Sequence, residues 1–204
     1  MDKNIYSLVL ASQSPRRQEL LKTLYVPFEI QPADLEEVSS QTDPRLLVED
    51  LAFQKASAVA KDLSLNDVVL GSDTIVVLDN KVLGKPTSRE HAREMLRSLS
   101  GRAHEVYTGV SIVAGSKNKN FSVETKVFFR EISPELMELY LDTKESMDKA
   151  GAYGIQSYAL SFIERIEGSY SNVVGLPVDH LLVELQNFMQ EYSGEKRVWR
   201  NYFV

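Results

Sequence analysis

Apolar segments of strand length and of helix length alternate along the chain, about every 10 to 20 residues, and this alternation constrains the fold most. The first segment, residues 7–11, runs directly into a helix that Ser14 can cap and Pro15 can begin. No repeat, low-complexity tract or long linker interrupts the later segments. The sequence therefore predicts an α/β or α+β architecture.

An acidic residue interrupts the apolar pattern between two predicted strands. Residues 68–70 are predicted to form an interior strand that ends at Gly71, and residues 75–78 to form the next strand, so Asp73 would lie between them. A hairpin turn is predicted at residues 79–80. The other predicted strands cover residues 28–31, 81–83, 105–113, 121–129 and 160–166.

The predicted helix over residues 87–99 has the clearest start signal, because Thr87 and Glu90 can form a capping box. Other helices are predicted over residues 46–63, 134–141 and 178–190. Residues 148–156 fit neither the helix period nor the strand period and are predicted to be irregular.

The length and composition indicate one compact unit. With 204 residues, 43% of them hydrophobic, the chain can bury a core, and we expect a single domain over residues 1–190 and a tail over residues 191–204 with exposed Trp199 and Phe203. Cysteine is absent, which removes disulfides and thiolate metal sites. The net charge of −6 argues against a nucleic-acid-binding surface. The apolar residues 8–11 are too few for a signal peptide or membrane span, so a cytoplasmic location is expected.

Two arginines, Arg16 and Arg17, occupy the first turn of the first predicted helix, where the helix dipole disfavours cations by roughly 0.3 to 1 kcal/mol each. The free N–H groups of a helix N-terminus already bind anions, so a strongly negative ligand such as a polyphosphate would offset the repulsion. Ser12 and Ser14 add hydroxyl donors on the approach loop. Alternatively, both arginines point into solvent or pair with Glu19 or with the acidic residues 34–37.

Asp73 is flanked by apolar residues and is expected beside the core, where acids are rare unless they are paired or bound to a metal. It could hold a divalent cation or accept a proton from water. A turn residue bonded to Thr74 or to a backbone N–H is an equally good alternative.

Two lysines and a glutamate are candidates to join Asp73. Lys85 follows the predicted hairpin and suits phosphate binding as a movable point charge, although exposed lysines are commonly just solvated. Lys55 lies beside the apolar face of a predicted helix, where a lysine often extends its ammonium to solvent. Glu37, next to Glu36, could add a second carboxylate for Mg²⁺, which takes one or two protein carboxylates together with phosphate oxygens and water.

Gln156 offers both a donor and an acceptor, as reading the edge of a uracil or thymine ring requires, although a plain glycine-rich connector would look the same. The three histidines, His91, His104 and His180, lack zinc-binding spacing and are interpreted as structural or exposed. The sequence contains neither a Rossmann nor a Walker phosphate loop.

Residues 10–21, LASQSPRRQELL, resemble the N-terminal signature of the Maf family. Further matches follow in the family's order: GSDT at residues 71–74, GKP at 84–86, LSG at 99–101, DKAGAYGIQ at 148–156 and VGLP at 174–177. Each motif is modest alone, but the ordered set is highly specific and extends from residue 8 to about residue 185.

The resemblance implies an elongated α/β fold similar to that of inosine triphosphate pyrophosphatases, with a mixed sheet and two lobes around a central cleft. It also implies a homodimer. The expected reaction is hydrolysis of a nucleoside triphosphate to a monophosphate and pyrophosphate, supported by a divalent cation, Mg²⁺ or Mn²⁺. Such an enzyme would act in nucleotide-pool housecleaning.

The resemblance also assigns roles to individual residues. Asp73 matches the proposed proton acceptor, and Glu37 matches an acidic partner for the metal. The phosphate-handling positions are matched by Ser12, Arg16, Arg17, Lys55 and Lys85, with Ser14 beside them. Arg16, Thr74 and Gln156 match the branch that prefers dTTP and UTP. The sequence leaves open whether Asp73 acts mainly as a base or as a metal ligand.

The leading alternative is a non-catalytic regulator that senses nucleotides or restrains cell division and septum formation, because it would need the same phosphate site. A nucleic-acid-binding domain is a weaker third hypothesis, disfavoured by the net charge.

Overall fold

A seven-stranded mixed sheet organises the chain in the computed structural model, which describes residues 5–156 and 158–203. The strands are β1 (Ser7–Leu10), β2 (Glu29–Ile30), β3 (Asp67–Leu78), β4 (Lys81–Leu83), β5 (Ala103–Ala114), β6 (Lys117–Phe129) and β7 (Ile163–Glu167). Their order is β2-β1-β3-β5-β6-β7, with β4 paired to β3. The pairs of β1 with β2 and β3 are parallel and the other pairs are antiparallel. The structure is therefore a mixed α/β fold.

The helices flank this sheet. They are α1 (Pro15–Lys22), α2 (Pro44–Ala60), α3 (Arg89–Leu99), α4 (Pro134–Asp142), α5 (Tyr170–Val174) and α6 (Val178–Ser193), with short 3₁₀ helices at Glu145–Asp148, Ala150–Ala152, Tyr158–Phe162 and Trp199–Tyr202. Ser14 caps α1 and Pro15 begins it, as predicted. Within the described part of the chain, no helix is both long and apolar enough to cross a membrane.

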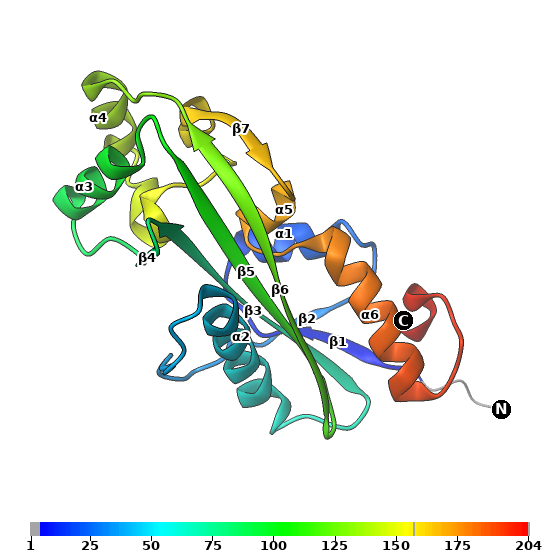
Figure 1. The fold of residues 1–204 in the computed structure, drawn as a ribbon. Coiled ribbons are helices and arrows are strands. Elements are labelled where there is room, and N and C mark those ends of the chain that lie inside the picture. The colour runs from blue at the N-terminus through cyan, green and yellow to red at the C-terminus, as the bar shows by residue number, and fades with distance from the viewer. Residues whose placement is uncertain (1–4, 157, 204) are drawn as a thin grey trace.

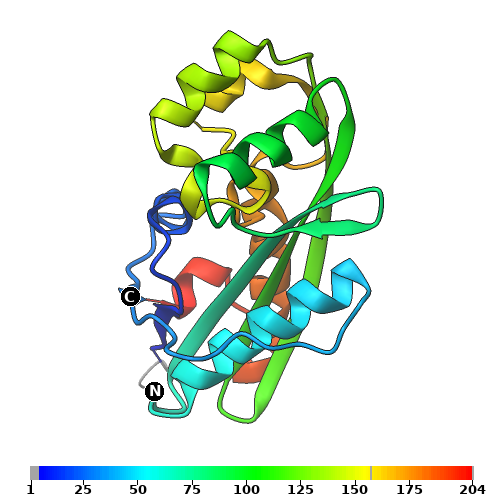
Figure 2. The same ribbon diagram turned by 90° about the vertical axis from the view of Figure 1, so that its left-hand side faces the viewer.

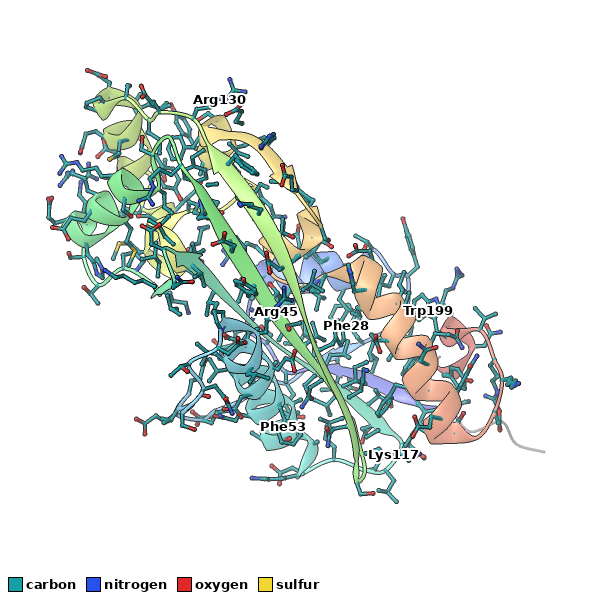
Figure 3. The ribbon with its side chains drawn as sticks, in the orientation of Figure 1. Phe28, Arg45, Phe53, Lys117, Arg130 and Trp199 are labelled. Atoms are coloured by element: carbon teal, nitrogen blue, oxygen red, sulfur yellow. The ribbon has the colours of Figure 1, made fainter. Side chains whose placement is uncertain are left out.

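The long strands β3, β5 and β6 connect two lobes (Figure 1). Strands of 12 or 13 residues span about 40 Å, and Lys117 and Arg130 lie near opposite ends of β6 (Figure 3). One lobe carries α3 and α4, and the other carries β1, α2 and α6 (Figures 1 and 2). The elongated two-lobed shape agrees with the expectation from the family resemblance.

Each lobe has its own apolar core. In one lobe the buried side chains come mainly from β1, β3, α6 and the C-terminal residues, including Leu10, Leu70 and Leu185. In the other lobe they come mainly from α3, α4 and the far ends of the long strands, including Leu96 and Tyr140. Separate cores at the two ends of shared strands leave the middle of the sheet available for a site.

The C-terminal residues pack into the first of these cores. Phe203 is only 4% exposed and Tyr202 is fully buried, so the expectation of an exposed Phe203 is wrong. Trp199 is partly buried against the same cluster. The backbone N–H of Tyr6 donates to the carbonyl of Tyr202. The large apolar side chains in this otherwise polar segment could have indicated that it is buried, because burying apolar surface is favourable.

Two glycines let α2 lie directly on the sheet. A Cβ atom added to Gly71 would lie 2.2 Å from the Ala52 carbonyl oxygen, and one added to Gly109 would lie 2.2 Å from the Val48 carbonyl oxygen. The prediction that Gly71 ends a strand is therefore wrong, since β3 continues without a break through Asp73 to Leu78. Here glycine permits close backbone approach between a helix and a strand.

Two smaller predictions also need correction. Helix α3 is capped by Ser88, whose hydroxyl oxygen accepts the N–H of His91, and not by Thr87. The strand predicted over residues 160–166 begins only at Ile163, after a 3₁₀ turn. Adjacent hydroxyl residues offer several caps of similar energy, so sequence alone places a helix end poorly.

Candidate active site

Two adjoining cavities of about 320 and 440 Å³ lie where the two lobes meet the middle of the sheet. Their walls come from the β1–α1 loop, α2, the centre of β3, the loop after β4 and residues 148–156. The predicted site residues that line one or both cavities are Ser12, Ser14, Arg16, Arg17, Glu37, Lys55, Asp73, Thr74, Lys85 and Gln156. The fold thus gathers the whole predicted set into one cleft.

An ammonium group lies between two carboxylates at the centre of this cleft. The Nζ atom of Lys55 lies 2.6 Å from Oδ1 of Asp73 and 2.8 Å from Oε2 of Glu37. The side chains of Lys55 and Asp73 are each only 12% exposed. Helix α2 packs closely on Gly71, which lies two residues before Asp73 in β3. This packing brings Lys55 of α2 next to Asp73. Lys55 therefore does not extend into solvent, because it balances charge inside the cleft.

Arg17 is held by contacts from three directions. Its Nε donates to the Gly175 carbonyl at 2.8 Å, one terminal nitrogen donates to Thr74 Oγ1 at 3.0 Å, and the other donates to Ser12 Oγ at 3.3 Å. Burial lowers the pKa of Arg17, and the nearby Asp73 carboxylate opposes that shift. A guanidinium oriented in this way is prepared for an anion that shares the cavity.

Arg16 has a different environment at the mouth of the cleft. Its Nη1 atom donates to Asp148 Oδ2 at 3.0 Å, and this ion pair joins α1 to the opposite lobe. Burial tends to raise the pKa of Asp148, but hydrogen bonds from Lys149 and Arg16 outweigh it and the pKa is lowered. The alternative of arginines that simply point into solvent fails for both residues, although Arg16 does pair with an acid.

The two serines support the arginines with their oxygens. Ser14 Oγ accepts the backbone N–H of Arg17 as the helix cap, and Ser12 Oγ accepts the backbone N–H of Ser14. In these contacts each hydroxyl is an acceptor, so its hydrogen can still donate to a phosphate oxygen. The serines therefore combine a structural role with the predicted donor role.

Lys85 and Gln156 approach from the other lobe. Lys85 is exposed and lines both cavities, and Gln156 is exposed at the edge of the smaller cavity. The Gly151 N–H donates to the Gly84 carbonyl at 3.1 Å, which ties the loop of Lys85 to residues 148–156. The smaller cavity also has an apolar part, with lining side chains that include Leu51, Ile75, Val76, Val106, Tyr153, Ile155 and Val173, beside the charged groups of the cleft.

Sequence reasoning assigned no role to Asp148 or Tyr153, although both belong to the irregular stretch that it singled out. Tyr153 lines the smaller cavity, and its hydroxyl lies 2.7 Å from Nε2 of the fully buried His104. Burial lowers the pKa of His104 to about 3, so this imidazole is neutral near pH 7. His104 is structural, as predicted, and it supports a wall of the cleft.

Asp73 and Glu37 are the predicted metal-binding pair. Both carboxylates already lie within 2.8 Å of one shared cation, the Lys55 ammonium, so they converge on a common point. In the described residues there is no group of three or more His, Cys, Asp or Glu side chains that could hold a metal. Mg²⁺ takes one or two carboxylates from a protein and completes its shell with phosphate and water oxygens, so this pair of carboxylates fits such a hard cation.

Known proteins with similar sequences cover nearly the whole chain. The dTTP/UTP pyrophosphatase of Bacillus cereus (strain ATCC 10987 / NRS 248) is 47% identical over 187 residues, which are 91% of this chain and 92% of the relative. The protein of the same name from Bacillus mycoides (strain KBAB4) is 49% identical over 182 residues, which are 89% of this chain and 95% of the relative.

Solved structures give more distant matches. The Ham1 protein of Staphylococcus aureus aligns with a TM-score of 0.45 and 19% identity, over 60% of this chain and 71% of that chain. A HAM1 protein from Coxiella burnetii aligns with a TM-score of 0.46 and 22% identity, over 61% of this chain and 73% of that one.

The family model described as "Maf-like protein" matches residues 7–188, a range that contains every residue placed in the cleft. With this match and relatives that are nearly half identical over nine-tenths of its length, the chain belongs to the Maf family.

Proposed function

We propose that the chain hydrolyses dTTP and UTP to the nucleoside monophosphate and pyrophosphate, and so removes these nucleotides from the cellular pool. The observation that carries the proposal is the convergence of Arg16, Arg17 and Lys85 on the same cleft as Asp73 and Glu37. The names of the similar Bacillus proteins support the same reaction.

The larger, more polar cavity suits the triphosphate. The N-terminus of α1 opens into it, and Arg16, Arg17 and Lys85 line it. Helix N–H groups and oriented guanidinium groups both bind phosphate oxygens. These cations stabilise the charge that develops on the departing pyrophosphate.

The smaller cavity suits the base and sugar. Its apolar walls can pack against a planar ring, and Gln156 at its edge supplies one donor and one acceptor. A uracil or thymine ring presents the complementary N3–H donor and a carbonyl acceptor on one edge. Gln156 can therefore pair with uracil or thymine, the bases in the names of the similar Bacillus proteins.

Asp73 is positioned to direct the attacking water. Water adds to the α-phosphorus, the bond from that phosphorus to the α–β bridging oxygen breaks, and the pyrophosphate leaves with that oxygen. Asp73 takes the proton that the water loses, while the Lys55 ammonium at 2.6 Å balances the carboxylate charge. Positioning and charge stabilisation supply most of the rate enhancement.

A divalent cation, Mg²⁺ or Mn²⁺, is part of the proposal. Asp73 and Glu37 would hold it, and the bound ion would neutralise phosphate charge near the reacting centre. Dialysis of the purified protein against EDTA should abolish pyrophosphate release, and added Mg²⁺ or Mn²⁺ should restore it. Full activity in the presence of excess EDTA would contradict the cation requirement.

The reaction is tested by hydrolysis in ¹⁸O-labelled water. Purified protein is incubated with dTTP or UTP, with dATP as a comparison substrate. The products are separated, and mass spectrometry determines which of them carries ¹⁸O. Attack at the α-phosphorus places the label in the monophosphate and leaves the pyrophosphate unlabelled. Intact nucleotide would instead support a nucleotide-sensing regulator, and orthophosphate with a diphosphate would indicate cleavage of the γ-phosphate.

The assembly and location are also proposals. We propose a homodimer, as the family resemblance implies. We also propose a cytoplasmic location with no nucleic acid or membrane partner, as the net charge and the short apolar segment at residues 8–11 indicate. Light scattering coupled to gel filtration measures the mass directly, and a particle of one chain mass would contradict the dimer.

A further inference from the structure

A chain of hydrogen bonds runs from the cleft into the sheet behind it. The guanidinium of Arg17 donates to Thr74 Oγ1 at 3.0 Å, and Thr74 Oγ1 lies 3.0 Å from Thr108 Oγ1. Thr108 Oγ1 in turn donates to the Asn172 carbonyl at 2.8 Å. Thr74 in β3 and Thr108 in β5 are directly opposed in the sheet, which explains the hydroxyl contact.

The direction of each bond follows from the chemistry of its two ends. A guanidinium only donates and a carbonyl only accepts, and each threonine hydroxyl has one hydrogen to donate. Thr108 gives its hydrogen to the Asn172 carbonyl, so it must accept the hydrogen of Thr74. Thr74 then has only lone pairs to offer, and one of them accepts the Arg17 N–H.

These bond directions give the hydroxyl of Thr108 a role beyond packing in the core. It is fully buried and does not line either cavity, yet its hydroxyl orients the Thr74 lone pair that receives Arg17. If Thr108 instead donated its hydrogen to Thr74, the Thr74 hydrogen would be free to point at the cationic guanidinium of Arg17. A directed chain of this kind gains strength from each bond along it.

We propose that Thr108 is a positioning residue, whose buried hydroxyl acts through Thr74 to fix the guanidinium of Arg17 in the phosphate-binding cleft. The inference rests on the proposed function only in taking Arg17 as a phosphate-binding group. Thr108 touches neither the substrate nor the reacting atoms, so its effect must vanish when Arg17 is absent.

The test measures binding of a dTTP analogue with a non-hydrolysable α,β-methylene bridge, by calorimetry, to five variants. Thr108→Val removes the hydroxyl at nearly constant volume, and Thr108→Ser keeps it. Ser111→Ala is the matched control, because Ser111 is also a buried hydroxyl of β5, bonded to Asn120 outside the cleft. Arg17→Ala and the double variant with Thr108→Val complete a double-mutant cycle.

The expected result is that Thr108→Val raises the Kd about 5- to 10-fold, the worth of one lost hydrogen bond. Thr108→Ser should stay within about twofold of the wild type, as should Ser111→Ala. In the Arg17→Ala background, Thr108→Val should cause no further loss. Wild-type affinity in folded Thr108→Val, or an equal loss without Arg17, would overturn the proposal.

Two precautions keep the outcome decisive. If Thr108→Val fails to fold in a thermal-melting check, Thr74→Val breaks the same chain one bond nearer to Arg17 and must weaken binding at least as much. The analogue reports binding without turnover. If the wild type binds the analogue but releases no pyrophosphate from dTTP, the proposed reaction is contradicted. The role of Thr108 in binding can still be tested in that case.

Discussion

The inner wall of the cleft and its mouth each present an arginine from the first turn of α1, but the two arginines are held differently. On the inner wall, Arg17 is fixed by a carbonyl and two hydroxyl groups. At the mouth, the Arg16 side chain is 28% exposed and pairs with Asp148, whose side chain is 62% exposed. The two residues are neighbours in sequence and share a helix turn, so their surroundings alone make this difference.

The difference indicates a division of labour. Neutral oxygen partners orient Arg17 without cancelling its charge, so its field remains available to an anion. The exposed ion pair of Arg16 is worth only about 0 to 1 kcal/mol, and an incoming phosphate can replace Asp148 as its partner. The inner wall is thus arranged before the ligand binds, while the mouth can change partners.

The largest expected effect concerns the carboxylate of the inner wall. Asp73→Asn should lower kcat for pyrophosphate release by about 10²- to 10⁴-fold, because the amide can neither accept the proton nor pair with Lys55 as a charge. Asp79→Asn is the matched control, since Asp79 is an exposed acid in the turn after the same strand, paired with Arg102. Near-normal turnover by Asp73→Asn would show that the Asp73 carboxylate takes no part in the reaction.

The next effect compares the two arginines directly. Arg17→Lys should lower kcat/KM about 10- to 100-fold, because lysine keeps the charge but cannot reproduce the three-way set of contacts. Arg16→Lys should cost less than about 10-fold, because one exposed pair is easily replaced. Equal losses of kcat/KM in steady-state assays of the two variants would contradict the proposed difference between Arg17 at the inner wall and Arg16 at the mouth.

A pH experiment extends the contrast to the buried support of the wall. His104 has a folded-state pKa of about 3, against an ordinary value of 6.5, so below pH 6.5 the unfolded chain binds a proton that the folded chain does not. The free energy of unfolding should therefore be highest above pH 6.5 and should fall toward pH 3 by up to about 1.4 kcal/mol per pH unit. Urea unfolding at several pH values measures this slope. His104→Gln should reduce it, and an unchanged slope would contradict the buried neutral imidazole.

The smallest expected effect is at the mouth. Asp148→Asn removes the competitor for Arg16 and should tighten triphosphate binding by about two- to threefold at low salt, with a smaller gain as salt screens the charges. Asp142→Asn provides the control, because Asp142 is an exposed acid paired with Arg89, outside the cleft. Calorimetry at two ionic strengths measures both variants. Weaker binding by Asp148→Asn would show that Asp148 supports the ligand and does not compete with it.

Local signals in the sequence were sufficient for most elements of the fold. Ser14 and Pro15 marked the start of α1, and the apolar periods located β1, α2, α4, β5 and β6 to within a few residues. Gly71 was misread, because a glycine that ends a strand and one that admits a helix look identical in sequence. The distinction depends on α2, which lies against that glycine only in the folded chain.

The cleft was predictable as a set of residues but not as an arrangement. Helix-tip arginines, an acid among apolar residues and the ordered family motifs selected the set, and each member lines the cleft. Nothing local in Lys55 indicates that it bridges Asp73 and Glu37. Asp148 and Thr108 also carried no local signal, because their partners lie 132 and 34 to 64 positions away along the chain.

By itself, the sequence determined the mixed α/β class, the capped helix with two cations at its tip and the membership of the Maf family, because capping, apolar periodicity and ordered motifs are encoded over short stretches. Only the tertiary structure decided which arginine is fixed and which can exchange its partner. Burial and hydrogen-bond partners are set by strands and loops distant in the chain, and these give adjacent, chemically identical side chains different electrostatic surroundings.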